Sequence, residues 1–318
     1  MAADATTPGP HQAITATNAQ ERFAARIFDT LWDRYRERVS YVGKYEEVIA
    51  AHHAKFVNDH IAFRTIASQS PQAGIASVSR VFEALGYRAA GSYQFPDKHL
   101  NAIHFQPPNP QFPKLFVSEL KTWEMSDETQ AAIANVVQSH RSAISLDALA
   151  KLYDMEEVPE EEHAALLQTV VAHFHDLPWS LVDKSALEAV NKESQYAAWV
   201  LVHGYNVNHF TAQINSQGVT ALDDIEKVIA ALTKAGVPMK TEIEGERGSK
   251  LRQTATEAVT IDVNVLDNGQ PATMPWTYAY FELAQRDPVL DPVTNKYTRF
   301  EGFLGAQATN LFEMTRVK

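Results

Sequence analysis

Two histidines and two glutamates occupy corresponding places in two segments of the chain. His60 begins the β-prone stretch HIAFRTIA, and His209 lies at the start of NHFTAQIN. Glu119 and Glu282 each lie in the last strand-like stretch of their own segment. Two imidazoles and one carboxylate form a facial set of ligands, which leaves open positions on iron(II) for a chelating substrate and O2. His60, His209 and Glu282 are therefore the predicted metal ligands.

A cation and two further polar residues accompany these ligands. Arg64 lies four residues after His60, and because side chains alternate between the faces of a strand, both should point to the same side. A guanidinium there can bind a carboxylate through two hydrogen bonds, although a structural ion pair fits the spacing equally well. Glu119 is expected to orient a ligand or a water, with roles as a fourth ligand or as a partner of Arg64 left open. Gln285, close to Glu282, is assigned a similar supporting role.

The composition excludes several classes of chemistry. The 318 residues include no cysteine, which excludes thiolate catalysis, cysteine-ligated zinc, iron–sulfur clusters and disulfide bonds. A net charge of -11 and the lack of a basic run argue against nucleic acid as a partner. Neither a glycine-rich nucleotide-binding pattern nor the GxSxG pattern of serine hydrolases occurs. An acidic protein that binds an acidic small molecule must supply its own cation, which favours a role for Arg64 in binding.

The distribution of apolar residues predicts a soluble protein. No apolar run approaches the roughly 20 residues that are needed to cross a bilayer. The first residues lack the basic start and apolar segment of a secretory signal. We therefore expect a cytoplasmic protein without membrane contact.

The elements that must position these residues follow one order twice. After an amphipathic helix in ERFAARIFDTLWDRYRERV, the first segment contains a strand, a helix and the strands AAGSYQF, LNAIHFQ and KLFVSEL. The second segment repeats this order, with KTEIEGE, AVTIDVNVLD and TYAYFELAQR as its later strands. A stretch of helical pattern separates the two segments.

This order predicts an α+β fold in which two β-α-β-β-β modules form an incomplete barrel around a metal cleft, a pattern that resembles the vicinal-oxygen-chelate superfamily. The N-terminal helix and the helical insert should cover the sheet. The predicted boundaries are 1–20 for a flexible tail, 21–318 for a single domain, and within it about 58–122 for the first module, 126–199 for the helical insert and 205–286 for the second module.

Five stretches of the chain resemble one enzyme family. They are DHIAFRT, FPKLFVSEL, HGYNVNHFT, FELAQR and RFEGFLGAQATNLFE. They are similar to the 2-oxoadipate dioxygenase/decarboxylase family, a divergent branch of the vicinal-oxygen-chelate superfamily, and the resemblance extends from about Phe23 to Phe312. It implies that His60, His209 and Glu282 bind iron(II) and that Arg64 contacts the carboxylate of the substrate.

The resemblance also implies a reaction. Such enzymes convert 2-oxoadipate and O2 to 2-hydroxyglutarate and CO2 by oxidative decarboxylation and hydroxylation within one molecule, and they are associated with lysine catabolism. A C-terminal segment at about 297–318 is expected to line the substrate pocket of the catalytic domain, with Ala306 and Gln307 as substrate-binding residues.

Two other classes of function remain open at this point. One is a metal-dependent isomerase or lyase with Glu119 as a fourth ligand, and the other is a non-catalytic protein that sequesters a small acid through Arg64. The oligomeric state and the stereochemistry of the product are left open as well.

Overall fold

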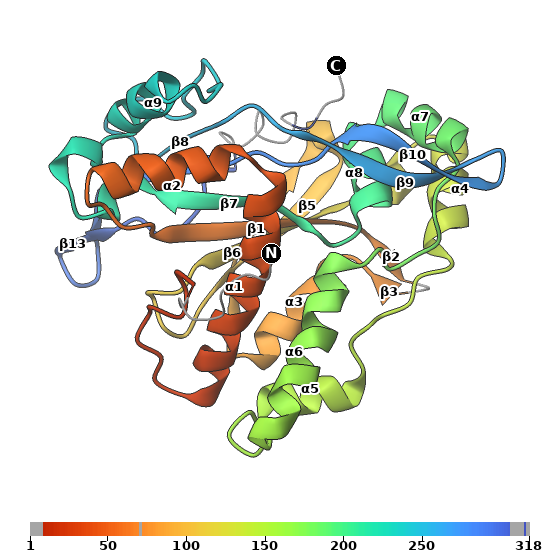
Figure 1. Cartoon of the computed structure of the whole chain (residues 1–318), viewed down its shortest axis with the longest axis horizontal. Helices are drawn as coiled ribbons and strands as arrows, with labels where there is room; N and C mark the ends of the chain where they lie inside the picture. The colour runs from red at the N-terminus through yellow and green to blue at the C-terminus, as the bar shows by residue number, and fades with distance from the viewer. Residues whose placement is uncertain (1–8, 70–71, 306–314, 316–318) are drawn as a thin grey trace.

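A curled sheet organises the fold in the computed structural model, which describes residues 9–69, 72–305 and 315 (Figure 1). Within these residues the sheet has seven strands in the order β4-β5-β6-β1-β7-β11-β8. In that order they are β4 (Arg88–Phe95), β5 (Leu100–Gln106), β6 (Lys114–Leu120), β1 (Asn58–Ile66), β7 (Val207–Gln213), β11 (Glu282–Arg286) and β8 (Leu251–Ala255).

Helices and three two-stranded hairpins surround this sheet. The helices are α1 (Ala19–Arg38), α2 (Tyr41–Ala51), α3 (Ile75–Ala84), α4 (Asp127–Val137), α5 (Leu146–Tyr153), α6 (Glu160–His175), α7 (Lys184–Glu193), α8 (Gln195–His203) and α9 (Ile225–Lys234). The hairpins are β2 (Ser68–Gln69) with β3 (Gln72–Ala73), β9 (Thr260–Asp267) with β10 (Gln270–Thr277), and β12 (Pro288–Asp291) with β13 (Lys296–Arg299). No helix in the described part of the chain is long and apolar enough to cross a membrane.

The strand pairing confirms the two predicted modules. In the first module β1 is parallel to β6, and in the second β7 is parallel to β11 in the same way. The modules meet where β1 pairs antiparallel with β7. This pairing is symmetric, because His60 lies opposite Thr211 while Ala62 lies opposite His209. The equivalence of His60 and His209 is therefore built into the sheet.

The second module departs from the expected strands in two places. The stretch KTEIEGE forms no strand and makes only an isolated bridge from Glu244 to Gln253, while Met239 just before it makes another to Thr256. The strand in this region is β8 instead, whose residues are all buried. The stretch AVTIDVNVLD does supply β9, but it pairs with β10 in a separate hairpin and does not join the sheet.

The N-terminal residues contact the domain from His11 onward, so the tail predicted for residues 1–20 does not extend that far. His11 is buried, and its Nδ1 lies 2.7 Å from Oδ1 of Asp29 in α1. The helix α1 itself begins at Ala19, with Asn18 accepting a hydrogen bond from the backbone N–H of Glu21. This cap satisfies one of the free N–H groups at the helix start.

Aromatic side chains attach α1 to the outer face of the sheet. The ring of Trp32 stacks on Phe56 with centroids 4.6 Å apart and meets Phe210 of β7 edge-on at 5.0 Å. Phe210 alternates with His209 along β7, so the same strand presents an aromatic ring to the helices and an imidazole to the opposite face. Packing on the outer face thus holds β7, the strand that carries His209, in position.

Replacing Trp32 with alanine should lower the free energy of unfolding by about 3–5 kcal/mol, because it removes a fully buried ring from this cluster. Urea denaturation followed by circular dichroism measures the change. Val293→Ala is the control, since Val293 is 90% exposed and its replacement should alter stability by no more than about 0.5 kcal/mol. Equal effects of the two substitutions would contradict the role given to this cluster.

Candidate metal centre and substrate pocket

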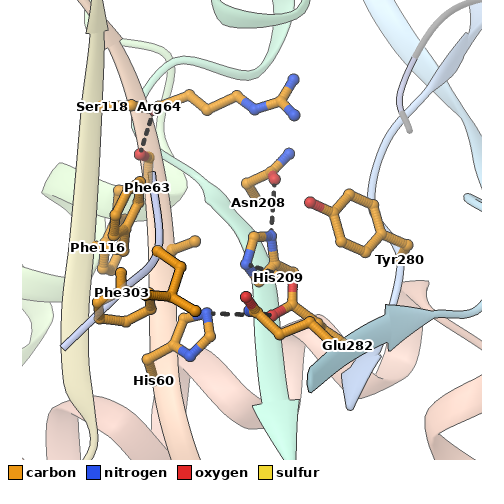
Figure 2. A pocket seen from close by; sticks show the side chains of 13 residues that line it. His60, Phe63, Arg64, Phe116, Ser118, Asn208, His209, Tyr280, Glu282 and Phe303 are labelled. Atoms are coloured by element: carbon orange, nitrogen blue, oxygen red, sulfur yellow. Dashed lines mark hydrogen bonds and ion pairs between the residues drawn. The ribbon is translucent and has the colours of Figure 1, made fainter. Parts of the chain in front are cut away.

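The three predicted ligands lie together on the inner face of the sheet, where they point toward one another (Figure 2). One donor atom from each of His60, His209 and Glu282 lies within 4.8 Å of the others. The Nε2 atom of His60 is 3.4 Å from Oε1 of Glu282, and Nε2 of His209 is 3.3 Å from Oε2. All three residues are buried. The ligand set expected from the sequence is thus assembled in the fold.

Two β-bulges place a polar residue beside each histidine. Between Asn58 and His60 the register of β1 against β7 shifts by one residue at Asp59, and between Ala62 and Phe63 it shifts at Asn208 of β7. Neighbours on a regular strand point to opposite faces, but a bulge redirects a side chain. Asp59 and Asn208 can therefore reach the rings of the histidines that follow them.

These two residues fix the tautomers of the histidines. Nδ1 of His60 donates to Oδ2 of Asp59 at 2.7 Å, and Nδ1 of His209 donates to Oδ1 of Asn208 at 2.9 Å. With the proton on Nδ1, each Nε2 carries a lone pair toward Glu282. A hydrogen bond to the far nitrogen is the usual way in which a metal-binding histidine is oriented.

Burial favours the neutral forms of all three ligands. It lowers the pKa of His60, against the effect of the hydrogen bond that His60 donates to Asp59, and it lowers the pKa of His209 well below its usual range, with His60 and Arg64 adding to the effect. Burial also raises the pKa of Glu282 well above its usual range, against a hydrogen bond from Gln253. The histidines are thus ready to bind a cation at neutral pH, and a cation would displace the proton of the glutamate.

The polar atoms around Glu282 fit a divalent metal ion. Nε2 of Gln253 donates to Oε1 at 2.6 Å, whereas the buried Oε2 has no hydrogen-bond partner among the described residues. A buried carboxylate oxygen without a donor costs free energy unless a cation binds it. Two imidazoles and one carboxylate are a donor set for iron(II), and they leave other coordination positions open.

A pocket extends from these ligands to Arg64, which lies at its other end (Figure 2). Arg64 is 2% exposed, and its Nη1 donates to Oγ1 of Thr315 at 2.7 Å. Its guanidinium also lies 5.1 Å from the ring centroid of Tyr196 and 5.4 Å from that of Trp199. The predicted shared face of His60 and Arg64 is confirmed, since both line the same cavity.

Aromatic residues form much of the remaining wall. Tyr280 stacks on His209 with ring centroids 4.8 Å apart, and Phe116 of β6 lies 4.9 Å from Phe303. Phe303 and Leu304 belong to the C-terminal segment, so its described part does line the pocket. Ala306 and Gln307, which were expected to bind the substrate, lie outside the described residues.

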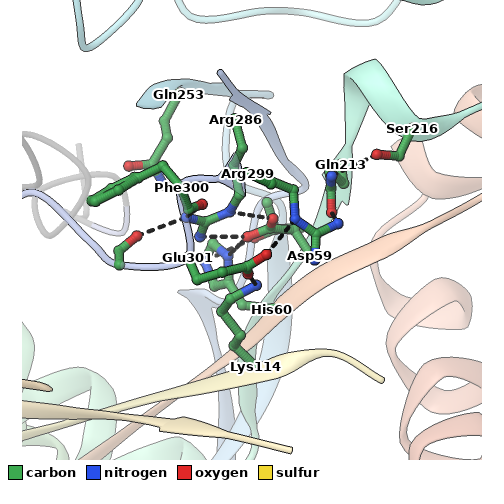
Figure 3. A network of polar contacts seen from close by, with 12 residues as sticks. Asp59, His60, Lys114, Gln213, Ser216, Gln253, Arg286, Arg299, Phe300 and Glu301 are labelled. Atoms are coloured by element: carbon green, nitrogen blue, oxygen red, sulfur yellow. Dashed lines mark hydrogen bonds and ion pairs between the residues drawn. The ribbon is translucent and has the colours of Figure 1, made fainter. Parts of the chain in front are cut away.

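A buried ion pair connects His60 to that C-terminal segment (Figure 3). Arg286 binds Asp59 through Nε and Nη2, the latter at 2.9 Å from Oδ2, and this guanidinium holds the pKa of Asp59 well below its usual range against the effect of burial. Nη1 of Arg286 donates to the carbonyl oxygens of Phe300 and Gly302. The same arginine therefore supports a ligand and positions the backbone before Phe303.

Glu119 does not lie at the metal centre, contrary to both roles expected for it there. In the repeat His60 corresponds to His209, and Ala62 therefore corresponds to Thr211. Thr211 lies opposite Glu282 on the neighbouring parallel strand, and Ala62 lies opposite Phe116 in the same way. Phe116 thus takes the place of a second carboxylate in the first module. Glu119 points to the other face, where its Oε2 accepts from the backbone N–H of Ile75 at the start of α3.

Gln285 has the same position and role in the second module. Its Oε1 accepts from the backbone N–H of Ile225 at the start of α9, at 2.9 Å. Both side chains cap the helix of their own module, so the prediction that they support a metal ligand was wrong. The prediction matched Glu119 to Glu282, but the true counterpart of Glu282 is Phe116, three residues earlier in β6.

Several residues of the site were not expected from the sequence. Asp59 and Asn208 each precede a ligand histidine, and this repeated pattern was a visible signal. Arg286 also stands near Glu282, but nothing in the sequence shows that it reaches Asp59. Phe116 became recognisable only from the strand register.

The position of Glu119 leads to a prediction about metal binding. Glu119→Gln should keep full metal affinity and change stability little, because Gln285 shows that an amide can accept the same backbone hydrogen bond. Glu282→Gln should lose metal binding, because an amide cannot supply the anionic ligand. Metal content after dialysis and calorimetric titration with Mn(II) measure both. Loss of metal binding in Glu119→Gln would instead support the hypothesis that Glu119 is a fourth ligand.

Comparisons with known proteins agree with this geometry. The family model for 2-oxoadipate dioxygenase/decarboxylase matches residues 27–300. A chloroplastic protein of that name from Arabidopsis thaliana is 28% identical over an alignment of 275 positions, which covers 81% of this chain and 67% of that protein.

Two crystal structures share the fold. A hydroxyglutarate synthase from Oryza sativa, in complex with 2-oxoadipate, has 23% identity and a TM-score of 0.74, over 99% of this chain and 98% of that one. A Ralstonia eutropha protein named for the glyoxalase superfamily has 22% identity and a TM-score of 0.78, over 89% and 86%. With a family model that matches most of its length, the chain belongs to the 2-oxoadipate dioxygenase/decarboxylase family of enzymes.

Proposed function

We propose that this protein is an iron(II)-dependent dioxygenase that converts 2-oxoadipate and O2 to 2-hydroxyglutarate and CO2. The observation that carries the proposal is the pairing of a three-ligand centre with a buried arginine at the far end of one pocket. A 2-oxo diacid has a chelating group at one end and a second carboxylate at the other. The two ends of the pocket match these two groups.

The donor set supports iron as the metal. Two histidines and one carboxylate, without any cysteine in the chain, are typical of non-haem iron(II) oxygenases. Bound iron(II) would supply the chelation of the 2-oxo acid and the activation of O2. The hydroxyl group of the product then comes from the same O2 that oxidises the substrate, so no second organic substrate is required.

The residues of the chain bind and orient the substrate. Arg64 holds one carboxylate by charge-assisted hydrogen bonds, and this fixes the distance between that carboxylate and the metal centre. Phe116, Phe303 and Tyr280 line the space between and exclude water from it. Asp59 and Asn208 keep the two imidazoles in the tautomer that binds a cation.

The names of the relatives support the choice of substrate. The Arabidopsis thaliana protein is named for 2-oxoadipate, and the Oryza sativa structure contains it. The alternative of an isomerase with Glu119 as a fourth ligand gains no support, since Glu119 caps α3. A non-catalytic acid-binding protein would require Arg64 but not the three converging ligands.

Oxygen uptake tests the reaction directly. Protein loaded with Fe(II) under anaerobic conditions should consume O2 on addition of 2-oxoadipate, release CO2 in equal amount and form 2-hydroxyglutarate. With isotopically labelled O2, both labelled atoms should appear in the product, one in the hydroxyl group and one in the new carboxylate. His60→Ala should abolish the reaction. If loaded wild-type protein consumed no O2 with any 2-oxo diacid of similar length, the proposal would be wrong.

A conservative change of Arg64 tests its role separately. Arg64→Lys keeps a positive charge but loses the paired hydrogen bonds, so KM for 2-oxoadipate should rise by about 10- to 100-fold while metal affinity stays unchanged. Steady-state kinetics and Mn(II) titration measure the two quantities. An unchanged KM would show that Arg64 does not bind the substrate.

A further inference from the structure

We propose that Asn208 is a substrate-binding residue, whose side-chain amide donates a hydrogen bond to the same carboxylate as Arg64 while it holds His209 in place. This inference rests on the function proposed above and adds a specificity-determining residue to it. It depends on the bulge in β7, which directs the amide oxygen of Asn208 toward His209 and leaves the amide nitrogen free to bind a ligand.

The oxygen of this amide is already assigned to His209. Nε2 of His209 faces Glu282, so Nδ1 carries the proton and donates it to Oδ1 of Asn208 at 2.9 Å. This bond determines which end of the amide is oxygen and which is nitrogen. The nitrogen therefore points away from the imidazole.

The nitrogen of Asn208 is buried and has no hydrogen-bond partner among the described residues. The residue is 1% exposed and lines the pocket. A buried amide nitrogen without an acceptor is uncommon, because it loses its hydrogen bonds to water without replacement. An acceptor supplied by a bound ligand would satisfy it.

The surroundings indicate which ligand group this acceptor belongs to. Figure 2 shows the amide of Asn208 between His209 and the guanidinium of Arg64, with its nitrogen directed toward the end of the pocket where Arg64 lies. The hydroxyl group of Tyr280 points to the same region. Two nitrogen donors at one end of a pocket suit a carboxylate, which has two oxygens to accept their hydrogen bonds.

The corresponding residue of the first module explains why an asparagine is required here. Asp59 occupies the equivalent bulge and also accepts from its neighbouring histidine, but Arg286 neutralises its charge. An aspartate at position 208 would face Arg64 and compete with the substrate for it. An asparagine keeps the acceptor for His209 and adds a donor in place of a negative charge.

The test separates binding of the substrate from binding of the metal. Wild type, Asn208→Leu and Asn208→Asp are saturated with Mn(II), and binding of 2-oxoadipate and of 2-oxohexanoate is measured by calorimetry. The second acid has the same chain but lacks the distal carboxylate. Asn135→Leu on the exposed side of α4 is the matched control for the change of side chain.

Both substitutions of Asn208 should weaken binding of 2-oxoadipate about tenfold or more and leave binding of 2-oxohexanoate nearly unchanged. Asn208→Leu should also weaken binding of Mn(II) about tenfold, whereas Asn208→Asp should not, because it keeps the acceptor for His209. The leucine variant excludes added charge as the cause, and the aspartate variant excludes loss of the support for His209.

Two results would overturn the inference while leaving the proposed function intact. They are unchanged affinity of Asn208→Leu for 2-oxoadipate, and equal losses for both acids, which would place the contact at the chelating end. If Mn(II)-loaded wild type bound neither acid, the proposed function itself would fail and this inference with it.

Discussion

The antiparallel pairing of β1 with β7 is the constraint on which the site depends. It joins the two modules, and its symmetry brings His60 and His209 to equivalent places on adjacent strands. Each strand carries one bulge, and these bulges allow Asp59 and Asn208 to hold the neighbouring imidazoles. A shift of this pairing by one residue would put the two histidines on opposite faces of the sheet. The aromatic packing of α1 on the outer face opposes such a shift.

The charges inside the sheet follow from the cost of burial. Glu282 is buried beside two histidines whose pKa values burial lowers, and burial raises its own pKa well above the usual range. Asp59 is equally buried, but Arg286 pairs with it and holds its pKa low. An ion pair of this kind is costly to break, because either partner alone would leave an uncompensated charge. Arg286 therefore binds both Asp59, which orients His60, and the backbone carbonyl groups of Phe300 and Gly302.

The sequence predicted much of this fold because the module repeats. Periodicity identified β1, α3 and the strands of the first module, and the repeat placed His60, His209 and Glu282 correctly. The errors arise where strand pairing matters. Alternation along one strand does not reveal which residue lies opposite another, so Glu119 was matched to Glu282 in place of Phe116. Nor does it reveal a bulge, and Asn208 would face away from the pocket on a regular strand.

Phe116 has a consequence for the charge of the centre. Two neutral imidazoles and one carboxylate leave a divalent ion with one net positive charge, whereas an acid in place of Phe116 would cancel it. An anionic chelator is attracted to the first arrangement and gains little from the second. The apolar ring at this position offers no ligand atom. A duplicated fold that could offer two symmetric acids thus offers only one, and a metal ion held there would keep a coordination position open for an exchangeable ligand.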